Sequence, residues 1–294
     1  MPATENTRAP EVHEHALGEQ HLAGAMALSR AASWNQCEAD WRMMLRLGEG
    51  WGLTAADGTL VASIIVLPYG DAFAWMSMVL VSPDHRRQGY ASRMLRRALA
   101  HLQSRGLAAV LDATPAGHEV YLQEGLRDTW GFQRYRLEQS LARAAGADVG
   151  AVNVRPLATQ DWPRLLELDL PAFGASREAL LRALAARLPE AALVAERDGG
   201  ICGYLLGREG REARQIGPLV AEDESVAQAL FGHALARVPG PLYADIVDRH
   251  TALRAWALAQ GFAVQRPFTR MVHGMNRAPG DSGTVMLVGG PELG

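Results

Sequence analysis

The sequence predicts an α+β protein that is built from two tandem domains. At 294 residues the chain is long for one domain and long enough to bury two cores. Its first half alternates apolar patterns of helical and of strand spacing, and its second half repeats their order. Small residues and glycine interrupt the pattern near residues 143–151, as is typical of a linker. We therefore expect an N-terminal domain over 1–143, a linker over 144–151 and a C-terminal domain over 152–294.

Each element of the first half follows from its own pattern of apolar and turn residues. Apolar residues recur at helical spacing from His21 to Arg30 and from Glu38 to Leu47. The stretch "WGLTAADGTLVASIIVLPYG" predicts a hairpin that turns at Asp57-Gly58. The elements expected after it are a buried strand over 73–81, a helix over 90–104, a buried strand over 107–114, a short helix over 118–125 and a strand over 132–139.

The second half repeats this plan with one addition at its end. Its expected elements are helices over 161–170 and 176–188, a hairpin over 191–208, a strand, loop and helix over 213–238, a strand over 241–247, a helix over 250–261 and a strand over 262–274. The ending "TVMLVGGPELG" is too apolar for a free tail, so we expect it to pair as an edge strand.

Composition excludes several classes of function. The formal net charge of -3 provides no basic field for nucleic acid or for an anionic membrane. Every basic side chain other than histidine is arginine, which excludes a lysine nucleophile or Schiff base. There is no signal-peptide core and no run of about 18 apolar residues. Because Cys37 and Cys202 fit no metal-binding spacing, we expect a cytoplasmic protein with reduced cysteines and no metal.

The stretch "MVLVSPDHRRQGYASRMLRRAL", residues 78–99, joins an apolar strand to a helix through a basic loop. The first turn of a helix leaves N–H groups unpaired and carries partial positive charge, so it favours phosphate. Gly89 lets the backbone approach a ligand, and Arg86 and Arg87 add guanidinium donors that fit phosphate oxygens. A solvated basic helix start is the alternative, but the order of strand, proline, arginine, glycine and helix favours phosphate binding.

This stretch resembles the acyl-CoA pyrophosphate loop of the GNAT acyltransferase superfamily. The superfamily pattern of glutamine or arginine, then glycine, then glycine or alanine is met by Arg86, Gly89 and Ala91. The resemblance covers roughly residues 10–141, and the second half resembles a degenerate copy. It therefore implies two tandem GNAT-like domains, each a mixed, mostly antiparallel sheet flanked by helices, with acetyl-CoA as co-substrate. The cofactor-binding residues that it implies are Val79, Leu80 and Val81 for the pantetheine arm, and Arg86, Arg87, Gln88, Gly89, Tyr90, Ala91 and Ser92 for the diphosphate.

The resemblance also implies a proton donor. The family often carries a tyrosine four residues before Gly-Phe, which corresponds here to Tyr121 in "YLQEGL", with leucine in place of the phenylalanine. A phenol of pKa near 10 is well matched to protonate a leaving thiolate of pKa about 8.5. The alternative is a packing role for Tyr121 on an amphipathic helix. The general base is less defined: Asp112 is one candidate, and Asp84, His85 and His118 are others.

Three further features carry weaker expectations. Trp34, Trp41, Trp51 and Trp75 form either core or an acceptor pocket for an amine with an apolar or aromatic body. In the second half, acids at 222–224 stand where the first half has its arginines, and alanine stands where it has Tyr121. We therefore expect that the second domain does not bind CoA in the usual way. The polar residues of that half, Asp245, Asp248 and His250, are expected in surface turns, with a shared cleft as the alternative.

The sequence thus predicts an N-acetyltransferase that moves an acetyl group from acetyl-CoA to a primary amine of a small molecule, by direct attack in a ternary complex. Strand N–H groups near Leu80 would polarise the thioester carbonyl. The alternatives are a non-catalytic acyl-CoA-binding regulatory or interaction module, and a longer acyl donor. The identity of the acceptor and the oligomeric state, with a homodimer as one option, do not follow from the sequence.

Overall fold

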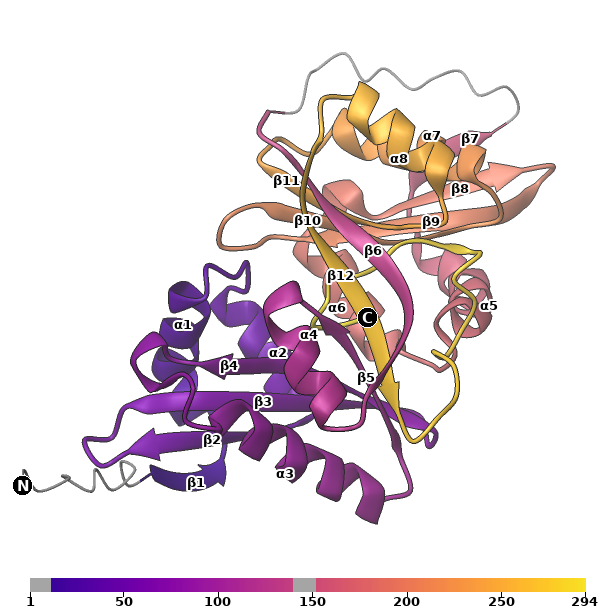
Figure 1. The fold of residues 1–294 in the computed structure, drawn as a ribbon. Helices are drawn as coiled ribbons and strands as arrows, with labels where there is room; N and C mark the ends of the chain where they lie inside the picture. The colour runs from indigo at the N-terminus through magenta and orange to yellow at the C-terminus, as the bar shows by residue number, and fades with distance from the viewer. Residues whose placement is uncertain (1–11, 140–151) are drawn as a thin grey trace, which may run out of the picture.

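The computed structural model describes residues 12–139 and 152–294 (Figure 1). The linker expected over 144–151 lies outside these ranges. The described part of the chain contains no helix that is both long enough and apolar enough to cross a membrane.

The first half begins with a short edge strand and two helices that precede a meander of three strands. Its elements are β1 (Val12–Ala16), η1 (Glu19–His21), α1 (Leu22–Ala31), α2 (Glu38–Leu47), β2 (Glu49–Ala55), β3 (Leu60–Tyr69), β4 (Phe73–Val81), η2 (Pro83–His85), α3 (Tyr90–Ser104), β5 (Ala108–Ala113), α4 (Pro115–Gln123) and β6 (Arg127–Leu137).

The second half follows the same order and ends with an additional strand. Its elements are β7 (Asn153–Pro156), η3 (Thr159–Asp161), α5 (Trp162–Phe173), α6 (Glu178–Arg187), η4 (Pro189–Ala191), β8 (Leu193–Arg197), β9 (Gly200–Arg208), β10 (Arg214–Ala221), α7 (Glu224–Leu235), β11 (Leu242–Val247), α8 (Thr251–Ala259), β12 (Ala263–His273) and β13 (Val285–Leu287).

The two halves share one 13-stranded sheet because they exchange their long strands β6 and β12. The strand order is β1-β2-β3-β4-β5-β12-β6-β11-β13-β10-β9-β8-β7. Strand β12 lies between β5 and β6, and β6 lies between β12 and β11, so each half is completed by a strand of the other. All pairs are antiparallel except β4–β5 and β10–β11. The expected fold class, with mixed and mostly antiparallel pairing in two tandem units, is confirmed.

The prediction that the ending pairs as an edge strand is wrong. Strand β13 lies inside the sheet, where it pairs with β10 through Leu219–Leu287 and with β11 through Ile246–Leu287. The reason is that β10 and β11 pair with each other only over 214–216 and 242–244. Beyond these residues they diverge, and the buried apolar side chains of β13 fill the space between them.

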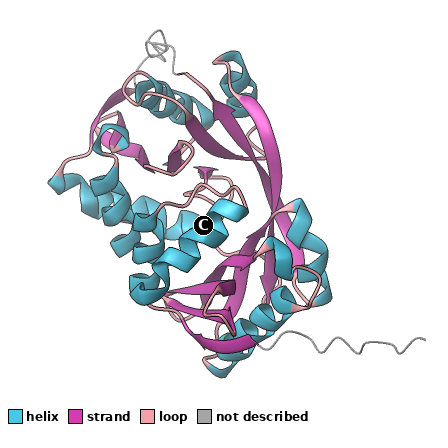
Figure 2. Ribbon diagram, turned by 90° about the vertical axis from the view of Figure 1, so that its left-hand side faces the viewer, coloured by secondary structure: helices cyan, strands magenta, loops and turns pink. Residues whose placement is uncertain are grey.

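Helices cover both faces of the sheet (Figures 1 and 2). Helix α3 packs on β2 to β5 with an apolar face that includes Met94 and Leu95, as the helical spacing predicts. Helices α1, α2, α5 and α6 contribute to one apolar cluster between the halves, for example through Trp41 and Leu181. Helices α7 and α8 cover the second half of the sheet. The inner cluster fixes the two halves against each other and thereby forms the walls of the site.

Candidate active site

A split in the sheet between β4 and β5 forms the base of the site. The two strands pair in parallel only where Phe73–Trp75 meets Ala108–Val110. Further along, Met78 has a positive φ of 52°, and β4 shifts its register against β3. Within residues 12–139 and 152–294, residues 76–81 of β4 therefore have no strand partner on the β5 side. Buried backbone groups need hydrogen-bond partners, so an extended ligand arm can pair in this split.

A cavity opens at the inner end of the split and is lined by both halves of the chain. Strands β4 and β5 form one wall, the loop between α1 and α2 forms a second, and β6, β12 and the segment after β13 close it. The lining residues are Trp34, Asn35, Gln36, Met76, Ser77, Met78, Val79, Leu111, Asp112, Thr114, Tyr121, Arg134, Arg266, Phe268, Pro291 and Glu292. Asn35 fixes the first loop to the second half, since its Oδ1 accepts hydrogen bonds from the N–H groups of Glu212 and Ala213 at 2.9 and 3.0 Å.

The basic loop lies at the outer end of the split, where β4 leads through η2 into α3. Arg86, Arg87, Gln88 and Gly89 are all exposed. Gly89 precedes the first residue of α3 with a φ of +78°, a conformation that suits glycine, and the space beside it is open. Among the ion pairs of residues 12–139 and 152–294, none involves Arg86 or Arg87.

Arginines further along α3 differ from this pair. Arg96 binds Glu124 at 2.7 Å, and Arg93 and Arg97 both reach Glu14 at 3.2 Å. These guanidinium groups are held by the protein's own carboxylates, whereas those at the helix start face solvent. The geometry is therefore able to hold a diphosphate, and binding of the diphosphate by residues 86–92 remains a prediction.

Tyr121 of α4 lies in the cavity wall and is 8% exposed. Burial raises the pKa of its phenol to about 12, so the hydroxyl stays protonated at neutral pH. Its ring lies against the first turn of α4, where a Cβ on Gly117 would be 2.9 Å from the hydroxyl oxygen. A buried, protonated phenol beside the split is able to donate a proton there.

Asp112 of β5 also lines the cavity, but the exchanged strand β12 holds both of its oxygens. Arg270 donates from Nε and Nη2 to the two carboxylate oxygens, each at 2.9 Å. Both side chains are buried. Burial raises the pKa of Asp112, and the guanidinium of Arg270 opposes part of that rise. The other base candidates, Asp84, His85 and His118, are not part of the cavity wall.

The four tryptophans divide between the two expected roles. Trp34 lines the cavity, whereas Trp41, Trp51 and Trp75 are buried in the apolar clusters. Trp75 still supports the site, because the guanidinium of Arg270 lies 4.3 Å from its ring centroid.

The expectation that Asp245 and His250 lie in surface turns is wrong. Asp245 is fully buried on β11 and accepts hydrogen bonds from Arg134 at 2.8 and 2.7 Å and from Gln215 at 3.1 Å. His250 is buried and contacts the carbonyl oxygen of Val285 at 2.9 Å. Asp245 thus joins β11 to β6 of the first half and to β10, and His250 contacts β13.

The segment 288–294 after β13 supplies a residue that the sequence analysis missed. The segment returns to the first half. There, Trp75 Nε1 donates a hydrogen bond to the carbonyl oxygen of Pro291 at 3.0 Å, and the Tyr69 hydroxyl donates one to the carbonyl oxygen of Leu293 at 2.9 Å. Glu292 is 2% exposed and lies in the cavity wall. The available signal was one acid in an apolar ending that was expected to be buried, since a buried carboxylate needs a partner.

The described residues of the second half, 152–294, form no equivalent of this site. Strand β13 fills the split between β10 and β11. Asp223 caps α7 by accepting hydrogen bonds from the N–H groups of Ser225 and Val226, both at 2.9 Å. Arg197 binds Asp223 at 2.8 Å and helps hold its pKa well below the usual range. The helix start that a phosphate would occupy is thus occupied by a carboxylate.

Sequence comparison matches both halves to acetyltransferase families. Residues 14–124 match the acetyltransferase (GNAT) family, and residues 165–287 match a second family described as an acetyltransferase (GNAT) domain. Together the two matches cover most of the chain.

Individual relatives agree with these matches. The uncharacterized N-acetyltransferase YitH of Bacillus subtilis is 25% identical over 247 residues, which are 84% of this chain and 86% of that protein. The holothin acyltransferase of a Pseudoalteromonas species is 28% identical over 191 residues, which are 65% of this chain and 63% of that protein. A solved structure of a putative acetyltransferase from Pyrococcus horikoshii has a similar fold, with a TM-score of 0.78 over 100% of this chain and 99% of that one, at 18% identity.

Proposed function

Because the chain is an acyltransferase of the GNAT family with two tandem GNAT domains, we propose that it transfers an acetyl group from acetyl-CoA to a primary amine of a small molecule. The amine attacks the thioester directly while both substrates are bound. The observation that carries this proposal is the unpaired split between β4 and β5, because it connects the exposed basic loop with Tyr121 and the cavity.

The proposed binding mode follows the split from its outer to its inner end. Arg86, Arg87 and the amides at residues 88–92 bind the diphosphate of CoA at the start of α3. The backbone of Val79, Leu80 and Val81 pairs with the pantetheine arm, for which the missing strand partner leaves room. The thioester then lies near Tyr121, and strand N–H groups near Leu80 polarise its carbonyl.

Tyr121 supplies the proton that the departing thiolate needs. Its burial keeps the phenol protonated at neutral pH, and its place in the cavity wall supports this role. The new C–N bond forms as the C–S bond breaks, and the phenol proton passes to sulfur. Asp112 is a candidate to accept the proton of the amine, but it has to do so while both of its oxygens are bound by Arg270.

We propose that only the first half binds CoA and that the second half completes the acceptor side. The filled split and the carboxylate at the start of α7 support this division. A second argument is that β12 and the segment 288–294 bring Arg266, Phe268 and Glu292 into the cavity of the first half.

The test is release of free CoA thiol from acetyl-CoA on a panel of small primary amines, together with calorimetry of CoA binding. We expect amine-dependent thiol release and one CoA per chain. Thermal protection by acetyl-CoA without thiol release on any amine would contradict acetyl transfer and favour a CoA-binding regulatory module. Two CoA molecules per chain would contradict the proposed division between the halves.

A further inference from the structure

Four charged side chains line the cavity, and they differ in how fully the protein satisfies them. Asp112 and Arg134 are each held in a buried ion pair with a residue of the second half. The other two, Glu292 and Arg266, come from the segment 288–294 and from β12. Glu292 shares its arginine with a second acid, and Arg266 has no ion-pair partner among the described residues.

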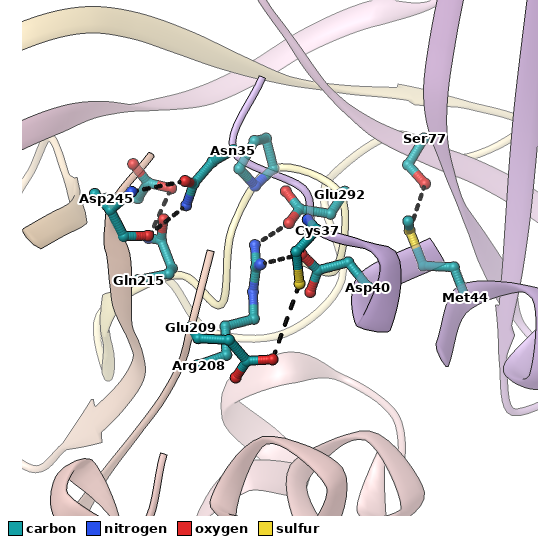
Figure 3. Close-up of polar contacts among 12 residues, drawn as sticks. Asn35, Cys37, Asp40, Met44, Ser77, Arg208, Glu209, Gln215, Asp245 and Glu292 are labelled. Atoms are coloured by element: carbon teal, nitrogen blue, oxygen red, sulfur yellow. Dashed lines mark hydrogen bonds and ion pairs between the residues drawn. The ribbon is translucent and has the colours of Figure 1, made fainter. Parts of the chain in front are cut away.

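Glu292 ends a row of five charged side chains in which acids and arginines alternate. Figure 3 shows Glu292, Arg208, Asp40 and Glu209 of this row. Arg208 contacts Glu292 and binds Asp40 at 2.8 Å, while Arg187 binds Asp40 at 2.8 Å and Glu209 at 2.7 Å. Three carboxylates thus share two guanidinium groups, which leaves one negative charge in excess. Glu209 is half-buried at one end of the row, and Glu292 lies in the cavity wall at the other.

The cavity wall also presents acceptor atoms that lack donors. Within the described ranges, Glu292 Oε2 and Gln36 Oε1 are buried and have no hydrogen-bond partner. Both residues are 2% exposed. Unsatisfied buried acceptors are costly, and one of these belongs to a carboxylate. A ligand ammonium has three N–H donors and one positive charge, so it supplies what these acceptors and the excess charge lack.

Arg266, in contrast, is a cation that lacks a carboxylate partner among the described residues. No carboxylate in the described parts of the chain forms an ion pair with it, and its buried Nε has no acceptor. Burial, together with the neighbouring charge of Arg134, lowers the pKa of Arg266. Phe268 lies under the guanidinium, 5.2 Å from ring centroid to Cζ, and supplies no negative charge. A ligand carboxylate fits this group because a guanidinium binds two carboxylate oxygens in parallel.

We propose that the acceptor is a zwitterion, a primary amine that also carries a carboxylate. Its ammonium binds at Glu292 and Gln36, its carboxylate binds at Arg266, and its apolar body lies between Trp34 and Phe268. The inference rests on the proposed function, since the ammonium it places becomes the attacking amine once it gives a proton to a carboxylate of the cavity wall. A simple alkylamine leaves Arg266 unmatched, and a diamine brings a second cation toward two arginines.

The test compares matched amines in the thiol-release assay. The acceptors are amino acids from glycine to 6-aminohexanoate together with phenylalanine, and each is paired with the amine of the same carbon skeleton that lacks the carboxylate. We expect kcat/KM to favour at least one amino acid over its matched amine about 10- to 100-fold. In Arg266→Gln this ratio should fall to about 1, because the variant loses the guanidinium that binds the carboxylate.

Arg182→Gln is the matched control, since Arg182 is an exposed arginine of α6 that pairs with Glu178. It should keep the wild-type preference. Glu292→Gln should lower kcat/KM for amino acid and matched amine alike, because both present an ammonium. Equal kcat/KM for all matched pairs in the wild type would overturn the proposal. So would an Arg266→Gln variant that keeps the full preference.

A binding measurement separates this inference from the proposed function. If no amine releases thiol, acetyl transfer to amines is wrong. Calorimetry of the same amino acids and amines with CoA-loaded protein then decides the acceptor class independently. Tighter binding of an amino acid than of its matched amine, lost in Arg266→Gln, would support the zwitterion site. Equal or undetectable binding of both would overturn it.

Discussion

Replacing Arg86 and Arg87 together with alanine is the most direct perturbation of the proposed phosphate site. Both guanidinium groups are exposed, and neither takes part in an ion pair among the described residues. The double variant therefore removes contacts to a ligand while breaking none within the protein. The free energy of unfolding should change by no more than about 0.5 kcal/mol, as is usual for unpartnered surface side chains.

The expected loss of CoA affinity follows from this exposure. A charge-assisted hydrogen bond contributes about 1.5–3 kcal/mol when shielded, but water screens an exposed pair to about 1 kcal/mol or less. Two such contacts give about 2 kcal/mol, which is an increase of about 30-fold in the Kd for CoA. The increase should be larger at low ionic strength, because salt screens exposed charges.

Isothermal calorimetry with CoA measures this change, and Arg96→Ala is the control. Arg96 lies on the same helix but binds Glu124, so its loss removes one positive charge without removing a phosphate contact. Its Kd for CoA should stay within about twofold of the wild-type value.

The result that refutes the reasoning comes from S-acetylpantetheine, which has the thioester arm and no phosphate. The double variant should bind this compound as the wild type does. If the two substitutions weaken S-acetylpantetheine and CoA equally, the loop does not act through the diphosphate. The assignment of residues 86–92 to the diphosphate would then fall.

Three further predictions test other parts of the site. Tyr121→Phe should lower kcat about 10- to 1,000-fold with the Kd for CoA nearly intact, and unchanged turnover would remove this phenol from the mechanism. Arg270→Met should lower the free energy of unfolding in urea by about 3–5 kcal/mol, because it leaves the buried Asp112 uncompensated, and adding Asp112→Leu should restore much of it. Arg197 and the helix cap lower the pKa of Asp223, so its contribution to stability is complete above about pH 4 and is lost as pH falls. The difference in Tm between wild type and Asp223→Asn should therefore shrink on acidification, and a difference that grows would contradict this.

Local patterns predicted the elements of the first half well. Helices were expected over 38–47 and 90–104, and α2 and α3 have those bounds. The strand expected over 73–81 is β4. Each of these elements has a complete signal within a few residues: an apolar period, a proline or a glycine at its end. The basic loop was found for the same reason.

Such local patterns do not predict which strands pair when they are far apart in the sequence. Nothing within "FAVQRPFTRMVHG" indicates that β12 pairs with β5 of the other half, because its alternation fits either partner. Similarly, the apolar character of β13 predicted burial but not its place between β10 and β11. Both outcomes depend on gaps that the fold creates elsewhere in the sheet.

The same limit explains which site residues were found. Tyr121 lies in a motif, whereas Asp245 and Glu292 have partners far away in the sequence, and Arg266 reaches the cavity only because β12 is exchanged. Asp245 was expected at the surface because a single acid in a strand gives no sign of Arg134, which is more than 100 residues away. Glu292 became visible only when the segment 288–294 was placed against the first half.

The exchange of β6 and β12 has a consequence for how the chain can be divided. A cut between residues 139 and 152 would leave every described strand of the shared sheet intact, since β6 ends at Leu137 and β7 begins at Asn153. Neither fragment would be complete alone, because each would expose the strand edge that the other normally covers. The two pieces should instead reassociate as a heterodimer with a reconstituted cavity, so the functional unit is the interlocked pair and not either domain.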